Sequence, residues 1–175
     1  ASDFNAFSET KYYVKDGQYV AYRWITQGEY CYVEPGGIIS SADVRPGATL
    51  IVSHGGVVSS AALATDTMGI NAHLLVHGKV SRYIGTQGGS ITVYDGGVVT
   101  SAVDGPKGEI IVSSGGLVSH LSATGNRCYV RSGGTASVVS VFGTLNVSGV
   151  AEHAQVLNGG KLILNPGAIL AGANT

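Results

Sequence analysis

Apolar residues recur along this chain in two ladders, and successive members of each ladder are separated by 17 to 24 residues. The first ladder consists of Val14, Val33, Val52, Val76, Val93, Val112, Val130, Val147 and Leu164. The second lies two residues before the first and consists of Tyr12, Cys31, Leu50, Leu74, Ile91, Ile110, Cys128, Leu145 and Leu162. A repeat that keeps one phase through nine units is typical of a solenoid, in which each unit contacts only its neighbours.

Within each unit, apolar residues alternate with other residues, and glycines separate the alternating segments. Residues 12–33 and 31–52 align without a gap, and the inward apolar set of the first unit includes Val20 and Ile25. Alternation of period two predicts strands with successive side chains on opposite faces. Strong helix formers are sparse, and the glycines recur too often for a helical run.

We therefore predict an all-β fold, a right-handed parallel β-helix (β-solenoid) of about nine rungs. At a strand spacing of about 4.8 Å, nine rungs would span roughly 40 Å. An antiparallel sandwich is the alternative fold, but it does not predict one register for every unit.

The domain organisation follows from where the repeat begins and where it is interrupted. Residues 1–11 precede the ladders and are expected to form an N-terminal cap, in which Phe4 and Phe7 plug the open end. Residues 12–175 form one β-helical repeat domain, with an insertion loop at about 64–72 that either carries function or is merely tolerated. Smaller excursions from the repeat occur at 104–108 and 124–127.

The two cysteines occupy one ladder position, five units apart, which predicts that they are not joined. At about 4.8 Å per rung, Cys31 and Cys128 would lie roughly 24 Å apart, far beyond the 7 Å or so that a disulfide tolerates between Cα atoms. Both replace Leu or Ile in an inward column, where a free cysteine behaves as a small apolar side chain.

Charge and hydropathy exclude several kinds of partner. The formal net charge is −1 and charged residues make up 12% of the chain, which gives no electrostatic reason to expect nucleic acid. No run of eighteen apolar residues occurs, so membrane insertion of this segment is not expected. The first residues also lack the basic start and apolar stretch of a signal peptide.

Catalytic and metal-binding arrangements are not evident, so we expect no enzyme, no metal and no cofactor. The acidic residues are scattered over the units and form no column that could hold a sugar between two carboxylates. His54 and His77 occupy turns of adjacent rungs, but no third ligand accompanies them. No nucleophile elbow, phosphate-binding loop or Cys-x-x-Cys motif is present.

The outward residues are unusually apolar and therefore predict an interface. The residue between the two ladders gives an outward column of Tyr13, Tyr32, Ile51, Leu75, Thr92, Ile111, Tyr129, Asn146 and Ile163. Nine of the 13 aromatic residues precede residue 33, and parity also points Tyr19, Trp24 and Tyr30 outward. The stripe can pack against another copy, be covered by another part of the full protein, or stack sugar rings.

The units SGGTASVVSVFGTLNV and NGGKLILNPGAIL resemble the glycine-rich repeats of AIDA-type autotransporter adhesins of Gram-negative bacteria, over about residues 12–170. The resemblance implies a secreted or outer-membrane-displayed β-helical passenger that acts in adhesion, autoaggregation or biofilm formation. In that family some repeat serines carry heptose, and the corresponding positions here are Ser40, Ser59, Thr100, Ser119 and Ser137. Small polar residues at these positions also suit a flat, solvated face.

These patterns lead to one function and two alternatives. The chain is expected to be a non-catalytic surface adhesin or autoaggregation module whose partner is a second copy or a surface receptor, with a glycan as a further option. The first alternative is a fibril or matrix subunit that stacks end to end, and the second is a carbohydrate-binding or polysaccharide-processing β-helix.

Overall fold

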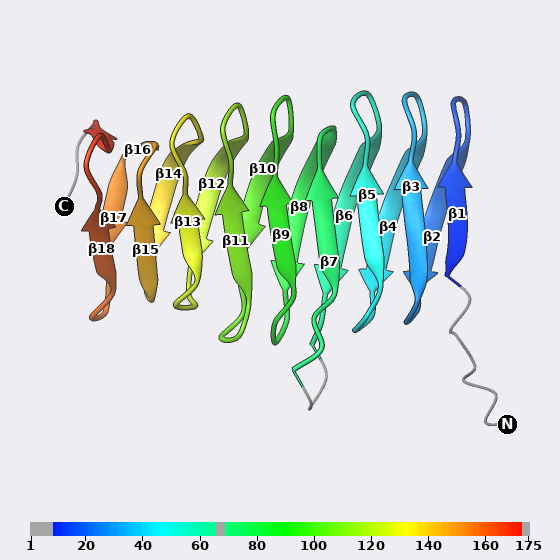
Figure 1. Ribbon diagram of the computed structural model, residues 1–175, viewed down its shortest axis with the longest axis horizontal. Coiled ribbons are helices and arrows are strands. Elements are labelled where there is room, and N and C mark those ends of the chain that lie inside the picture. Colours follow the sequence, from blue (N-terminus) through cyan, green and yellow to red (C-terminus); the bar gives the residue numbers. More distant parts are fainter. Residues whose placement is uncertain (1–8, 66–68, 173–175) are drawn as a thin grey trace, which may run out of the picture.

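The computed structural model describes residues 9–65 and 69–172, which form two parallel sheets wound into one solenoid (Figure 1). The first sheet contains β1 (Thr10–Val14), β3 (Glu29–Val33), β5 (Thr49–Val52), β7 (His73–Val76), β9 (Ser90–Val93), β11 (Glu109–Val112), β13 (Cys128–Val130), β15 (Thr144–Val147) and β18 (Lys161–Leu164). The second contains β2 (Tyr19–Ile25), β4 (Ile38–Val44), β6 (Val57–Leu63), β8 (Lys79–Gly85), β10 (Val98–Val103), β12 (Leu117–Ala123), β14 (Thr135–Val141), β16 (Val150–Glu152), β17 (Ala154–Val156) and β19 (Ile169–Ala171). The predicted all-β parallel β-solenoid is confirmed.

Each rung contributes one strand to each sheet, except that the rung after β15 contributes both β16 and β17 to the second, and equivalent residues pair across rungs. Val14 pairs with Val33, and Val33 pairs with Val52, so the first ladder runs continuously through the first sheet. The longer unit does not disturb this register, because Val52 pairs directly with Val76. The sequence ladders are therefore rows of stacked side chains inside the solenoid.

Two adjacent glycines with different tasks form the turn from the first sheet to the second. Gly36 has a φ of +77°, in the left-handed region that side-chain-bearing residues rarely adopt. Gly37 instead approaches the rung before it, since a Cβ added there would lie 2.3 Å from the carbonyl oxygen of Val14. The double glycine thus sets both the bend of the turn and the close spacing of the rungs.

The core consists of the two ladders together with the inward residues of the second sheet. Ladder residues such as Leu50 and Leu74 are fully buried. In the end rungs the ladder is more open: Tyr12 is 36% exposed and Leu164 is 50% exposed. Each of these two rungs has a described neighbour on one side only, so its side chains lack half of the packing found in the middle.

The strands of the second sheet contain one break in their alternation. Val20 and Ile25 both belong to the apolar interior side although they are five residues apart, an odd number. The pairing of β2 with β4 passes from Val20↔Ile39 to Tyr22↔Ser41 and skips Ala21 and Ser40. One extra outward residue per strand therefore shifts the parity, as in a β-bulge.

The structure bears on the predicted cap, the predicted insertion and the predicted free cysteines. Residues 1–8 of the expected cap, including Phe4 and Phe7, lie outside the described residues, and Thr10 already belongs to β1. Of the insertion, Thr65 and Asn71 form an antiparallel bridge at its base, while residues 66–68 are not described. The cysteines are free and buried, as predicted.

The three excursions share one edge of the solenoid. The insertion joins β6 to β7, residues 104–108 join β10 to β11, and residues 124–127 join β12 to β13. All three are turns from the second sheet back to the first, at the lower edge in Figure 1. Among the described residues, no helix is long and apolar enough to span a bilayer.

Candidate functional site

Two stacked tyrosines begin the outward column of the first sheet. Tyr13 on β1 and Tyr32 on β3 are paired in register, with ring centroids 5.1 Å apart and planes inclined by 13°. Tyr13 is 41% exposed, so one broad aromatic face remains open to solvent. Stacked aromatic rings of this kind pack readily against another apolar surface or a sugar ring.

The predicted outward column continues from these tyrosines along the whole first sheet. Registers place its members side by side: Tyr13, Tyr32, Ile51, Leu75, Thr92, Ile111, Tyr129, Asn146 and Ile163. None of them is buried. We call this row the apolar stripe.

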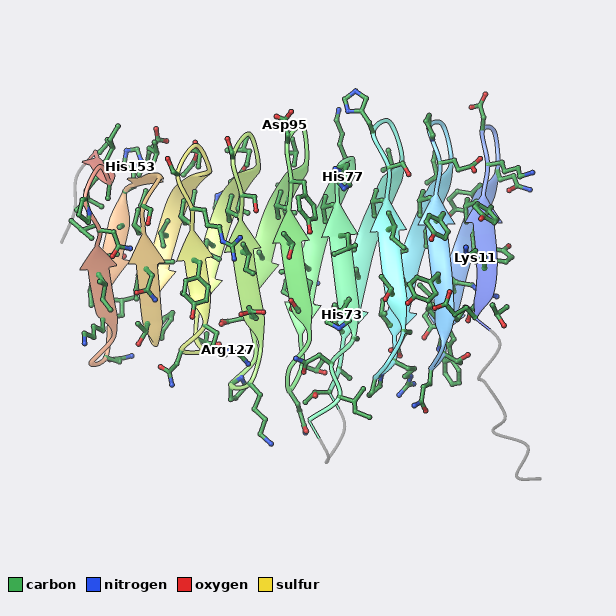
Figure 2. The ribbon with its side chains drawn as sticks, in the orientation of Figure 1. Lys11, His73, His77, Asp95, Arg127 and His153 are labelled. Carbon is green, nitrogen blue, oxygen red and sulfur yellow. The ribbon has the colours of Figure 1, made fainter. Side chains whose placement is uncertain are left out.

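A polar row lies beside the apolar stripe on the same face. Each member precedes a member of the stripe by two residues: Lys11, Tyr30, Thr49, His73, Ser90, Glu109, Arg127, Thr144 and Lys161. Figure 2 shows Lys11, His73 and Arg127 on successive parts of this face, and Asp95 at the opposite edge from Arg127. A polar row thus borders the apolar stripe, as polar residues border the apolar centre of a protein interface.

A second aromatic group lies on the other sheet. Tyr22 and Trp24 of β2 meet edge to face, with centroids 6.3 Å apart at 64°, and the Trp24 indole donates a hydrogen bond to the Tyr22 hydroxyl. The guanidinium of Arg45 lies 4.9 Å from the centre of the Trp24 ring and is 3.2 Å from a carboxylate oxygen of Asp43. Trp24 is 55% exposed and Tyr19 is 65% exposed, so this group is largely open to solvent.

An ion pair lies inside the solenoid near its first rung. Arg23 points inward from β2 and pairs with the buried Glu29, and its guanidinium lies 4.0 Å from the centre of the Tyr12 ring. Glu29 also accepts a hydrogen bond from the backbone N–H of Thr26 at 3.1 Å. Burial raises the pKa of the nearby Cys31 thiol to about 11, and the Arg23 charge lowers it by a smaller amount.

The structure divides the expected interface residues between two opposite surfaces. Tyr30 lies with the apolar stripe on the first sheet, whereas Tyr19 and Trp24 lie on the second sheet. Sequence parity missed Tyr22, which is 53% exposed beside Trp24. The sequence does indicate this, because Val20 and Ile25 both point inward although they are five positions apart. Two neighbouring residues between them must therefore both point outward.

The candidate glycosylation residues form one column on the second sheet. Ser40, Ser59, Thr100, Ser119 and Ser137 all occupy the extra outward position of their strands, and none is buried. Ser81 of β8 belongs to the same column, between Ser59 and Thr100. It escaped the sequence comparison because the glycine of its unit, Gly78, arrives one residue early. Six hydroxyl groups therefore lie in six consecutive rungs.

A buried polar cluster interrupts the core near the 104–108 turn. Asp104 is 3% exposed and accepts hydrogen bonds from the backbone N–H of Gly125 at 2.9 Å and from the Cys128 thiol at 3.0 Å. Its other carboxylate oxygen is bonded by the backbone N–H and hydroxyl of Thr124. Burial, and then the negative charge of Asp104, raises the pKa of both Cys128 and the enclosed phenol of Tyr83. These bonds hold the 104–108 and 124–127 turns together.

His54 and His77, which were predicted to lie in turns of adjacent rungs, line the same small cavity. His54 and His77 line a cavity of about 200 Å³, and the His77 ring stacks on Tyr94 with centroids 4.6 Å apart. In the part of the chain that the structure describes, no three His, Cys, Asp or Glu side chains come together as a metal site would require.

Comparison with known proteins identifies a solved structure with the same fold. No protein-family model matches the sequence, and a search of curated protein sequences found no match. Among solved structures, the crystal structure of a TibC-catalysed hyper-glycosylated TibA fragment is similar, with a TM-score of 0.56 and 19% sequence identity. The similarity covers 95% of this chain and 93% of that one. At this identity the likeness establishes the shared solenoid fold and nothing finer.

Proposed function

We propose that this chain is a non-catalytic adhesion module of a bacterial surface protein, and that it associates with a second copy through the apolar stripe. The observation that carries the proposal is the row of unburied, mostly apolar side chains that runs along the first sheet beside a polar row. The likeness of the repeats to AIDA-type adhesins supports an extracellular location, and the fold shared with the hyper-glycosylated TibA fragment is consistent with it.

A second copy suits the stripe because its sequence is compatible with a two-fold arrangement. If two solenoids lie antiparallel with the axis at Thr92, Leu75 of one copy faces Ile111 of the other. The same arrangement sets Ile51 against Tyr129, and both contacts occur twice, as in any isologous interface. In the polar row beside the stripe, His73 then faces Glu109.

The size of the stripe predicts that a single contact between two copies is weak and that association depends on many such contacts. A stripe of roughly 40 Å by 10 Å buries about 400 Å² per copy, about half of the 800 Å² per partner that is usual in stable complexes. Such a contact becomes strong only when many copies face one another on two surfaces. Autoaggregation of cells is the process that fits this requirement.

The proposal is tested by static light scattering of the protein over a range of concentrations. The variant Ile51→Ser/Leu75→Ser/Ile111→Ser removes three members of the stripe and should abolish association. The matched control is Val57→Ser/Val98→Ser/Leu117→Ser, which alters three residues of similar exposure on the second sheet. Association that survives in the first variant would contradict the proposal and favour end-to-end stacking of rungs.

A second candidate function is the display of O-linked sugars, favoured by the hydroxyl column of the second sheet. Six Ser and Thr side chains at one strand position repeat at about 4.8 Å, so one modifying enzyme would meet the same local structure in every rung. Coexpression with TibC, which glycosylates the similar TibA fragment, followed by peptide mass mapping tests it. Modification of Ser59 and Ser119 is expected, and an unchanged mass would contradict it.

A further inference from the structure

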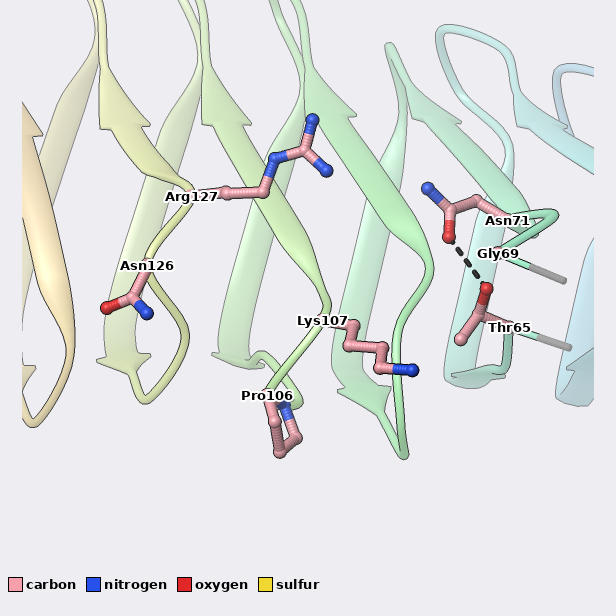
Figure 3. Close-up of a pocket in the computed structure, with 7 residues that line it drawn as sticks. All are labelled: Thr65, Gly69, Asn71, Pro106, Lys107, Asn126 and Arg127. Carbon is pink, nitrogen blue, oxygen red and sulfur yellow. Dashed lines mark hydrogen bonds between the residues drawn. The ribbon is translucent and has the colours of Figure 1, made fainter. Parts of the chain in front are cut away.

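The three departures from the repeat converge on one groove. Residues from the insertion, from the 104–108 turn and from the 124–127 turn line a single cavity of about 370 Å³ (Figure 3). This volume lies within the range of roughly 300–1,000 Å³ that is usual for ligand pockets. The lining residues are Thr65, Gly69, Asn71, Pro106, Lys107, Asn126 and Arg127.

A glycine in the intervening turn allows the insertion and the 104–108 turn to lie close to it. The turn from β8 to β9 lies between the insertion and the 104–108 turn, and it carries Gly88. A Cβ at Gly88 would lie 2.6 Å from the Cγ2 of Thr65 and 3.6 Å from the Cβ of Lys107. Any larger residue would therefore intrude between the two walls.

The groove carries positive charge that the described residues neutralise only in part. Lys107 forms no ion pair with any described residue. Arg127 has a 58% exposed side chain, and its contact with Glu109 is long, at 3.8 Å between Nε and Oε1. None of the described residues that line the groove is acidic, and the Asp104 carboxylate behind it is buried and hydrogen-bonded.

The two cations face a wall of neutral polar groups. In Figure 3 the side chains of Lys107 and Arg127 extend from their turns toward the segment that holds Thr65 and Asn71. The Thr65 hydroxyl and the Asn71 side-chain oxygen are 2.9 Å apart, which fixes this wall. On the other side, Asn126 accepts a hydrogen bond from Thr144 at 3.3 Å, which orients its amide.

We infer that this groove binds an acidic oligosaccharide, with the sugar carboxylates held by Lys107 and Arg127. Amide and hydroxyl side chains at both walls suit sugar hydroxyl groups, and the Pro106 ring offers an apolar contact for the C–H face of a sugar. The planar guanidinium can hold a carboxylate by two parallel hydrogen bonds.

The length of the groove favours an oligosaccharide over a small free anion. From the insertion to the 124–127 turn, three rung spacings cover about 14 Å. A single sulfate or phosphate would occupy one end and leave the opposite wall unused. The groove shares Arg127 with the polar row, but none of its lining residues belongs to the apolar stripe, so replacing Ile51, Leu75 and Ile111 should leave sugar binding intact.

The test is calorimetric titration of the protein with trigalacturonate, with neutral trigalactose and with inorganic sulfate. Trigalacturonate is expected to bind more tightly than either of the others, and its affinity should fall as salt is raised, because exposed charges are screened. Lys107→Gln/Arg127→Gln should weaken trigalacturonate binding by about tenfold or more, since hydrogen bonds to charged groups are lost.

The control is Lys161→Gln/Arg131→Gln, which removes the same two charges at exposed positions outside the groove. This variant should bind as the unaltered protein does. If both variants lose the same affinity for trigalacturonate, the loss is due to net charge alone, and the inference is overturned. It is also overturned if trigalacturonate does not bind at millimolar concentration, or if sulfate or trigalactose binds as tightly.

Discussion

The thiol of Cys128 donates a hydrogen bond to the buried carboxylate of Asp104 across neighbouring rungs, at a distance of 3.0 Å. The same carboxylate receives the backbone N–H groups of Thr124 and Gly125. The side-chain oxygens of this buried carboxylate are thus bonded by the 124–127 turn and by the first residue of β13 that follows it. The bonds fix that turn beside the 104–108 turn, and both turns line the groove.

Asp104→Asn is expected to destabilise the protein by about 2–4 kcal/mol, because an amide cannot accept from all the donors that surround this carboxylate. Urea unfolding followed by circular dichroism measures the loss. Asp95→Asn serves as the control, since Asp95 lies in an exposed turn at the opposite edge. Equal stabilities of the two variants would show that the buried bonds contribute nothing.

Stability should decrease as the pH rises from about 9 to 11. Burial raises the pKa of the Cys31 thiol from 9.0 to about 11, so within this window the unfolded chain loses a proton that the folded chain keeps. The raised folded pKa stabilises the fold fully below pH 9, and about 2 kcal/mol is lost by pH 11. The raised pKa values of Cys128 and Tyr83 act in the same direction.

Thermal unfolding at a series of pH values measures this loss, and Cys31→Ala should reduce its slope. A slope that does not change in Cys31→Ala would assign the alkaline loss to other groups.

The two positions of the double-glycine turn should differ in how well they tolerate a side chain, because the first has a positive φ and the second lies close to the preceding rung. Gly17→Asn should cost at most about 1 kcal/mol, because asparagine tolerates the left-handed region and a Cβ there meets no atom within 4 Å. Gly37→Asn should cost at least about 2 kcal/mol, because its Cβ would strike the Val14 carbonyl. Chemical denaturation of the two variants compares them directly, and the reverse order would contradict the assignment.

Ladder position along the solenoid should determine the cost of removing a side chain. Leu74→Ala is expected to cost about 2–5 kcal/mol, because Leu74 is fully buried in a central rung. Leu164→Ala should cost less than about 1 kcal/mol, because Leu164 is 50% exposed. Melting temperatures provide the comparison, and similar losses at both positions would mean that exposure does not measure packing here.

The fold was predictable because its determinants are periodic. Two ladders two residues apart require strands, and nine units in one phase require parallel stacking of equivalent strands. What periodicity could not show is the interior of the first rung, where Arg23 and Glu29 replace apolar residues. Their pairing depends on the parity break after Val20, which a strict alternation overlooks.

The groove could be predicted only in part. The insertion and the two smaller excursions were each visible as departures from the repeat. Their meeting at one edge depends on which of the two turns in each rung they interrupt, and the close approach at Gly88 depends on side-chain distances. Neither relationship is encoded in the spacing of apolar residues.

Variation in chain length at one edge leaves the strand register unchanged, which makes this solenoid a natural carrier for foreign peptides. The insertion adds residues between β6 and β7, yet Thr49 still pairs with His73 and Leu50 with Leu74. The bridge between Thr65 and Asn71 closes the base of the loop. A peptide epitope grafted between these two residues should therefore be displayed on a rigid support, at a fixed height along the solenoid and without refolding the rungs on either side.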